Sequence, residues 1–220
     1  MQHVLKYNAV LLYFLLAFFT YLMVRITLPY GEMKSDTAFL ALKQSYIDNR
    51  VWMNAFYIHV FTSCFLLLAG FTQFSNKILK KRRTLHRNMG KMYVFVLLFA
   101  SGPAGFIMSI YANGGLYSKI AFTMLSVLWL TFTALAWYYA VKRNFVKHKN
   151  FMILSFALTC SALTLRLWKM GIVYAFNPHP MDAYRIVAWL GWVPNLLLAL
   201  WLIRPVSTKN KVPGTTMRNT

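Results

Sequence analysis

Two histidines open the same short pattern at separate places in the chain, in the tetrapeptides His-Arg-Asn-Met from His86 and His-Lys-Asn-Phe from His148. Each pattern precedes a long apolar stretch. Asn88 and Asn150 are predicted helix N-caps, because an asparagine side chain accepts from free N–H groups of the first turn. The repeated pattern thus predicts both imidazoles at one height on parallel helices. Such a pair can ligate a haem iron or share a divalent metal ion. Among basic residues at a membrane boundary, it can also bind lipid phosphate.

His59 and Arg166 are ionisable side chains inside apolar stretches. Counted from the stretch ends, both lie about 10 Å deep at about 1.5 Å per residue, which predicts a similar depth. Ionisable groups inside a bilayer are costly and mark sites that face the bundle interior. We therefore expect His59 to be a ligand or proton carrier and Arg166 to bind a carboxylate, a propionate or a quinone oxygen. The alternative is a hydrogen bond from His59 to a neighbouring helix, with Arg166 extended to the headgroups as Lys169 is expected to be.

Three further polar side chains inside these stretches, Asn195, Thr159 and Trp129, are candidates for lining a cavity. Asn195 follows Pro194, which predicts a break in the backbone of that stretch. The indole N–H of Trp129 lies far from either end of its stretch and needs a hydrogen-bond partner. Threonines such as Thr159 can bond between membrane helices. A kink or a close helix contact is expected at Gly102-Pro103-Ala104-Gly105.

The elements that must position these side chains are six apolar stretches, each long enough to cross a bilayer as a helix of about 20 residues. They cover residues 7–28, 51–76, 88–111, 118–141, 150–174 and 184–203. Continuous apolar runs favour helices over a barrel, whose strands alternate apolar and polar residues. The predicted fold class is all-α, a polytopic membrane protein with six transmembrane helices in a bundle.

The domain organisation expected from these stretches is one six-helix transmembrane domain over residues 1–204, followed by a cytoplasmic polar tail over 205–220. The first stretch lacks a small-residue cleavage site, so we expect a retained helix rather than a cleaved signal peptide.

The charge is strongly unbalanced, with 24 Lys and Arg against 4 Asp and Glu in 220 residues and a formal net charge of +20. The basic residues cluster between long uncharged stretches, and 59% of the chain is apolar, so we expect no nucleic-acid partner. Sixteen of the 24 basic residues fall at the termini and in the loops after the second and fourth stretches, whereas all four acids fall in the opposite loops. The positive-inside rule then predicts an inner (plasma) membrane protein with both termini cytoplasmic, its basic side against anionic lipid headgroups.

Several motifs together resemble the bacterial integral-membrane family DUF2306, over roughly residues 52–203. They are His59 with Gly70-Phe71-Thr72-Gln73-Phe74, the run from His86 to Tyr93, Leu128-Trp129, His148 with Met152, Leu158-Thr159, Thr164-Leu165-Arg166, Ala188-Trp189 and Trp192-Val193-Pro194-Asn195. Lys149 stands where the family pattern usually has Arg. The activity of this family is undefined. The resemblance implies that the four candidate residues, His59, His86, His148 and Arg166, belong to one family pattern.

The layout of histidines also resembles that of membrane haem-b cytochromes of the b561 type, which enclose two haems between four helices with two layers of His ligands. In this chain His86 and His148 form an inner pair, whereas His59 has no second histidine at its depth. What the resemblance implies is therefore one inner haem b, or a quinone or other small ligand near His59 and Arg166.

Two classes of function remain open from the sequence. The first is a membrane redox protein that binds haem b or quinone within the bundle. The second is a non-enzymatic membrane transporter, or an accessory or assembly factor for a membrane complex. No Gly-rich phosphate loop, Gly-x-Ser-x-Gly or His-Glu-x-x-His motif is present, and no acid lies inside a predicted span. The sequence does not specify a complex partner or a homo-oligomeric state.

Overall fold

The computed structural model describes the backbone of residues 2–203 and the side chains of residues 13–70, 72–75 and 78–203. All regular structure in this part is helical. The elements are α1 (Gln2–Thr27), η1 (Leu28–Glu32), η2 (Leu40–Tyr46), α2 (Arg50–Gln73), α3 (Asn76–Lys81), α4 (Arg83–Val96), η3 (Leu97–Ser101), α5 (Gly102–Ile110), α6 (Leu116–Val141), α7 (Phe145–Thr159), α8 (Ser161–Phe176), α9 (Pro180–Leu190) and α10 (Val193–Leu202). The predicted cytoplasmic tail, 205–220, lies outside the described residues.

Six helical segments are long and apolar enough to cross a membrane, which confirms the predicted six-span all-α fold. They are Tyr13–Glu32, Arg50–Gly70, Arg83–Ile110, Leu116–Val141, Phe145–Phe176 and Pro180–Leu202. The first span is α1 continued by the short 3-10 helix η1, and the third, fifth and sixth spans are also each built from more than one helix. These are α4, the π-helical turn η3 and α5; α7 and α8; and α9 and α10. The protein is therefore an integral membrane protein with three interrupted spans.

The helix starts predicted at Asn88 and Asn150 are wrong. Helix α4 begins at Arg83 and α7 at Phe145, so His86 and His148 each lie inside the helix, as its fourth residue. The N-cap of α7 is Asn144, whose side chain accepts from the Lys147 N–H at 3.2 Å. This earlier cap forms because α6 ends in a turn whose next residue, Arg143, has a left-handed backbone (φ 56°).

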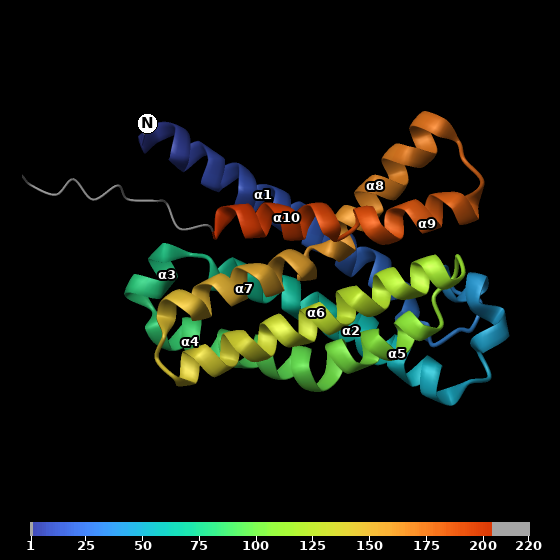
Figure 1. Ribbon diagram of the computed structural model, residues 1–220, viewed down its shortest axis with the longest axis horizontal. Coiled ribbons are helices and arrows are strands. Elements are labelled where there is room, and N and C mark those ends of the chain that lie inside the picture. The colour runs from blue at the N-terminus through green and yellow to red at the C-terminus, as the bar shows by residue number, and fades with distance from the viewer. Residues whose placement is uncertain (1, 204–220) are drawn as a thin grey trace, which may run out of the picture.

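The main core lies where α2, α4, α6 and α7 run side by side, with α10 packed against α7 (Figure 1). Its buried apolar residues are Leu66, Ala69, Tyr93, Leu97, Trp129, Ala136, Met152, Leu158 and Trp192. Helices α1, α8, α9 and α10 lie along one side of this group (Figure 1). The four central helices therefore position His59, His86 and His148, whereas Arg166 comes from the peripheral helix α8.

The two ends of the bundle differ in charge. Helix α1 begins and α10 ends at the end that also carries α3 and the turn between α6 and α7 (Figure 1). We call this the basic end, because its exposed basic side chains are Lys80, Lys81, Arg82, Arg83, Arg87, Lys142, Arg143, Lys147 and Lys149. The opposite end carries η1, η2 and the acids Glu32, Asp36, Asp48 and Asp182. A second small core of Tyr30, Leu40, Trp52 and Phe56 closes that opposite end.

Candidate functional site

His86 and His148 lie at the basic end on two different helices, α4 and α7, close enough for their charges to interact. The Nδ1–H of His148 donates to the Ala136 carbonyl of α6 at 2.8 Å. A carbonyl oxygen can only accept, so Nδ1 carries the proton and Nε2 of the neutral ring keeps a free lone pair. A backbone carbonyl bonded to one ring nitrogen is the usual way in which proteins orient a metal-binding histidine.

The His86 ring is held less completely. Its Nδ1 is buried and has no partner of full hydrogen-bond geometry among the described residues, but the Thr72 backbone lies close enough to form a weaker hydrogen bond with the ring. Its own backbone carbonyl accepts from the Gln73 side chain at 3.0 Å, which ties α4 to the end of α2. Buried nitrogens without partners are rare in native proteins. The His86 ring is thus held by a weaker backbone contact than the His148 ring.

His59 occupies the other half of the bundle, beside the π-helical turn η3. Its Nδ1–H donates to the Ser101 carbonyl at 2.9 Å, which leaves Nε2 as the free nitrogen of the neutral ring. Ser101 is the last residue of η3, and its hydroxyl also bonds Ser63 at 2.8 Å. Gly105 allows α5 to approach, because a Cβ there would lie 3.0 Å from the imidazole. The close helix contact predicted for residues 102–105 is therefore present, and the carbonyl at the end of η3, just before this segment, orients His59.

Arg166 extends from α8 towards α2 and η1. Its guanidinium donates to the Ala162 carbonyl of its own helix at 2.6 Å. His59, Tyr30 and Cys64 all lie within range of its charge. His59 and Arg166, which the sequence placed at similar depth, are therefore within range of each other's charge, but no hydrogen bond joins their side chains. His86 and His148 form a separate pair near the basic end.

Trp129 and Thr159 belong to a buried network of hydroxyl groups in the centre of the bundle. The indole N–H of Trp129 donates to Thr159 Oγ1 at 3.0 Å, which confirms that this group has a partner. The Tyr93 hydroxyl bonds Thr159 at 2.7 Å and Ser155 at 2.8 Å, and Ser155 bonds Thr133 at 2.7 Å. Each member has a partner, so the network joins α4, α6 and α7 by polar contacts in a water-poor region.

Asn195 lies where the two interrupted spans cross. Its side-chain amide donates to Thr164 Oγ1 at 2.9 Å and to the Ala157 carbonyl at 3.3 Å. The Thr164 hydroxyl in turn donates to the Gly191 carbonyl. The break predicted from Pro194 is confirmed at Gly191, whereas the matching break at Cys160 has no proline to announce it. Asn195 therefore bonds groups at both breaks.

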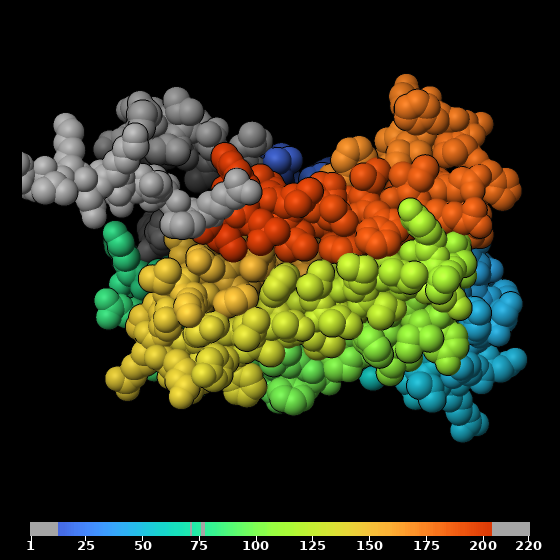
Figure 2. Space-filling view, in the orientation of Figure 1, coloured from blue at the N-terminus to red at the C-terminus, as the bar shows by residue number. Residues whose placement is uncertain are grey.

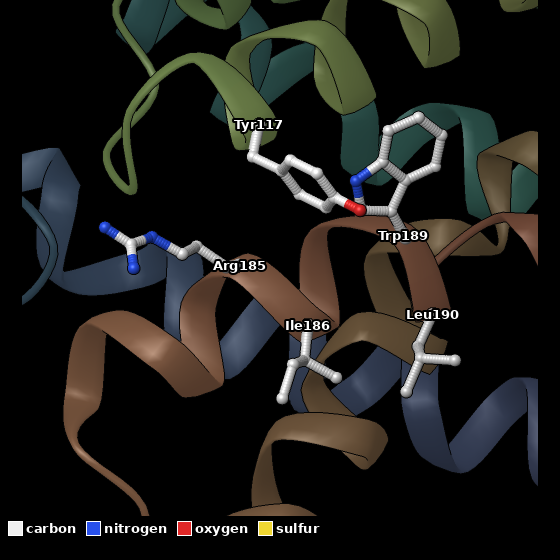
Figure 3. Close-up of a pocket in the computed structure, with 5 residues that line it drawn as sticks. All are labelled: Tyr117, Arg185, Ile186, Trp189 and Leu190. Carbon is white, nitrogen blue, oxygen red and sulfur yellow. The ribbon is translucent and has the colours of Figure 1, made fainter.

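The surface depressions do not coincide with these side chains. One, of about 480 Å³, is lined by Tyr117, Arg185, Ile186, Trp189 and Leu190 (Figure 3). Figure 3 shows Tyr117 beside Trp189, with Arg185 directed away from both. The Arg185 side chain donates to the Gly114 carbonyl at 3.1 Å. A second, of about 600 Å³, lies on α2 and α5. Neither includes Asn195, Thr159 or Trp129, so their role in lining a cavity stays a prediction.

Lys43 is a buried cation that the sequence did not single out. Its side chain is 3% exposed, and its ammonium donates to the Tyr111 carbonyl and lies 5.0 Å from the centre of the Tyr46 ring. Burial and, to a lesser degree, the positive charge of Lys119 lower the pKa of Lys43 from 10.5 to about 8. The sequence offered only one signal, the aromatic residue Tyr46 three positions away.

The model of a family described as predicted membrane protein (DUF2306) matches residues 56–203. The chain belongs to this family. The match spans all four candidate residues, His59, His86, His148 and Arg166, and it confirms the resemblance inferred from the motifs. No curated protein and no solved structure matches the chain at a significant level. The likeness to haem-b cytochromes therefore stays a prediction, and the family description names no activity.

The side chains that can ligate a metal ion limit what each region of the structure can bind. Among the described residues, no group of three or more His, Cys, Asp or Glu side chains comes close enough to hold a metal ion. A zinc-type site, which needs at least three protein ligands, is therefore not supported in this part of the chain. A haem iron needs only two axial ligands, because the porphyrin supplies the others. The pair His86 and His148 fits that smaller requirement.

Proposed function

We propose that the protein is a membrane redox protein that binds haem b near the basic end of the bundle, with His86 and His148 as axial ligands. The observation that carries this proposal is the bond from His148 Nδ1–H to the Ala136 carbonyl, which leaves Nε2 free to ligate iron. His86 supports it with a ring that is held only by a weak contact to the Thr72 backbone and lies within charge range of His148. Haem held there supplies one-electron transfer within the membrane.

The residues around the pair suit the charge of such a group. Arg87 and Lys149 directly follow the two histidines and are exposed at the basic end. Consecutive helical residues do not face one another, so the two cations favour propionate groups through their charge at this end of the bundle rather than through a contact that the sequence fixes. Met89, Phe151 and Met152 contribute apolar and sulfur contacts at the same level of the core.

The test is an absorption spectrum of the full chain, expressed with added haem precursor and purified in mild detergent. We expect a Soret band with about one haem per chain, which His148→Ala removes and His86→Ala removes or shifts. His179→Ala is the matched control, because His179 lies in the α8–α9 turn at the opposite end. A folded, colourless protein without iron, or an unchanged spectrum in both variants, overturns the proposal.

A transporter or an accessory factor of a membrane complex is the second candidate. It is favoured by the crossing of two interrupted spans at Thr164 and Asn195, because paired discontinuous helices form the binding sites of many secondary transporters. Gentle solubilisation of native membranes separates these roles. A particle much larger than one chain favours an accessory factor, whereas a small particle without haem favours a transporter.

The orientation that accompanies both candidates is also a proposal. The protein lies in the inner (plasma) membrane with its basic end on the cytoplasmic side, so both termini are cytoplasmic. The exposed Lys and Arg side chains of that end contact anionic headgroups. The separation of basic and acidic side chains between the two ends supports this orientation.

A further inference from the structure

The segment that contains η2 lies at the end of the molecule opposite α3 (Figures 1 and 2), and it carries the buried cation Lys43. The Lys43 ammonium donates to the Tyr111 carbonyl, which uses one of its three N–H donors. A neutral carbonyl does not cancel a full charge. Burial lowers the pKa of Lys43 to about 8, so the group is still protonated at neutral pH. A buried charge is costly unless it is paired, which makes the partner of Lys43 a question about function.

Acidic side chains of the described residues do not pair with Lys43. Asp36 and Asp48 lie on either side of η2 in the sequence, but both are exposed and neither is within ion-pair distance of the ammonium. The ion pairs in the described part of the chain are Lys34 with Glu32 and Arg185 with Asp182. The described residues therefore leave the charge of Lys43 without a counter-charge.

Trp52 brings a second donor to the same place. Its side chain is 1% exposed, and its indole N–H is buried without a hydrogen-bond partner among the described residues. The Lys43 ammonium lies 5.9 Å from the centre of the Trp52 ring. Both groups can only donate, and buried N–H groups without acceptors are rare in native proteins. The chemistry that both side chains require is thus an acceptor that also carries negative charge.

The surroundings limit the size of that acceptor. The Tyr46 ring lies 5.0 Å from the ammonium and packs against the rings of Tyr111 and Trp52, with centres 5.2 and 6.2 Å apart. On its other side, the Trp52 ring stacks on Phe56 at 5.6 Å. Neither of the surface depressions described above is lined by Lys43 or Trp52. The place is enclosed by aromatic rings, so it suits a single ion and excludes a lipid headgroup or an organic substrate.

We propose that Lys43 and Trp52 bind a halide ion, chloride in size and charge, between η2 and the first turn of α2. A chloride ion accepts from the ammonium and from the indole N–H at once, and it supplies the missing negative charge. A water molecule can accept from both groups but leaves the charge uncompensated. The bound ion ties η2 to α2 and so stabilises the small core at this end. This site is at the opposite end from the proposed haem site and does not depend on it.

The test is the melting temperature of the full chain in detergent, with chloride exchanged for gluconate at constant ionic strength so that charge screening does not change. A ligand bound only by the folded protein stabilises it, and we expect a saturable rise of about 3 °C or more with chloride. Lys43→Met should abolish the rise. Trp52→Phe, which loses the indole N–H, should require about tenfold more chloride for the same rise. Lys34→Met is the matched control and should keep the rise, because Lys34 is exposed and paired with Glu32.

Three results overturn the proposal. The first is an equal melting temperature in chloride and gluconate, which is expected if a water molecule meets the two donors. The second is a chloride-dependent rise that Lys43→Met retains. The third is an unchanged chloride requirement in Trp52→Phe. Haem content has no bearing on any of these outcomes.

A second measurement avoids the Lys43 variants, in case Lys43→Met does not fold. Bromide has the charge of chloride, and its heavy atom quenches tryptophan fluorescence on contact. We expect a saturable component of quenching that chloride displaces and that Trp52→Phe removes. Trp201→Phe is the control and should keep this component, because Trp201 is 64% exposed and meets bromide only by collision. Quenching that never saturates, or a saturable component that Trp52→Phe leaves unchanged, overturns the proposal.

Discussion

Asn195 donates to the Thr164 hydroxyl across 2.9 Å and so joins the interruption of the fifth span to that of the sixth. Each interruption leaves backbone carbonyls without their helical donors, and hydrocarbon offers no water to replace them. The Asn195 amide reaches the Ala157 and Gly191 carbonyls as well, at 3.3 and 3.4 Å. One side chain thus supports two breaks at the same level of the bundle.

Replacing Asn195 by leucine is expected to destabilise the protein. Asn195→Leu removes these bonds, which leaves the Ala157 carbonyl without this donor and the Gly191 carbonyl with the Thr164 hydroxyl alone, at a cost of about 1–2 kcal/mol. Thermal unfolding in detergent, followed by tryptophan fluorescence, measures the loss. Asn54→Leu is the control, since Asn54 is exposed within α2 and lines a surface depression. Equal melting temperatures for the two variants would contradict the assigned role.

The hydroxyl network predicts coupling between two positions. Tyr93→Phe and Thr159→Val each remove one end of the 2.7 Å bond between these side chains, and each is expected to cost about 1–2 kcal/mol. Because both changes break the same bond, the double variant should lose clearly less than the sum. A double-mutant cycle in chemical denaturant measures the coupling, with Tyr138→Phe as an exposed tyrosine control. If the loss of unfolding free energy in the double variant equals the sum of the two single losses, the bond between Tyr93 and Thr159 does not contribute to the stability of the bundle.

Gly70 predicts a steric effect of a single methyl group. A Cβ at this position would lie 2.1 Å from the end of the Phe156 ring, so Gly70→Ala forces α2 and α7 apart. We expect a lower melting temperature, partly restored by combining the change with Phe156→Leu. Gly171→Ala is the control, because nothing lies within 4 Å of its added Cβ. An unchanged melting temperature in Gly70→Ala would mean that the Phe156 ring can turn aside freely.

Lys43 predicts a dependence of stability on alkaline pH. Its pKa is lowered to about 8 in the folded protein, against 10.5 in the unfolded chain, so between these values the unfolded chain binds more protons. Stability from this group should therefore rise as pH increases from 8 to 10.5 and stay constant below 8. Lys43→Met should remove that rise, whereas Lys34→Met, an exposed lysine paired with Glu32, should keep it. Melting curves across this pH range, compared between variants, provide the measurement.

The orientation predicts which loops an external reagent reaches. In a background with Cys64 and Cys160 replaced by serine, we expect Asp36→Cys to react with an impermeant maleimide in intact cells. Lys142→Cys should react only after lysis, since Lys142 lies at the basic end. The reverse pattern would place the basic end outside and contradict the proposed cytoplasmic termini.

The six spans were predictable because each crossing needs a long run of apolar residues whatever its partners are. Breaks inside a span were predictable only where a residue type signals them. Pro194 announced the break before α10, whereas Cys160 and Ser161 fit a continuous helix equally well. Asparagine caps were ambiguous for a similar reason, because Asn144 and Asn150 both suit a helix start and only the turn at the end of α6 selects the first.

The depth of the candidate side chains in the membrane was predictable from the sequence, but the direction in which each side chain points was not. Counting residues placed His59 and Arg166 at one level, and their charges do interact. The bonds from His59 to Ser101 and from His148 to Ala136 depend on how each helix is rotated and on local irregularity, which residue types alone do not fix. The Tyr93 network was missed although Ser155 and Thr159 are spaced to share a helix face, because their partners come from other helices.

The π-helical turn at Leu97–Ser101 divides the third span into two registers. A turn of this kind amounts to one extra residue, and one residue corresponds to about 100° of rotation around a helix. Tyr93 before the turn and Gly105 after it therefore face their partners only because the extra residue is present. Deleting one residue there would keep the span long enough to cross the membrane, yet it would turn every side chain of α5 away from the neighbour that it now meets.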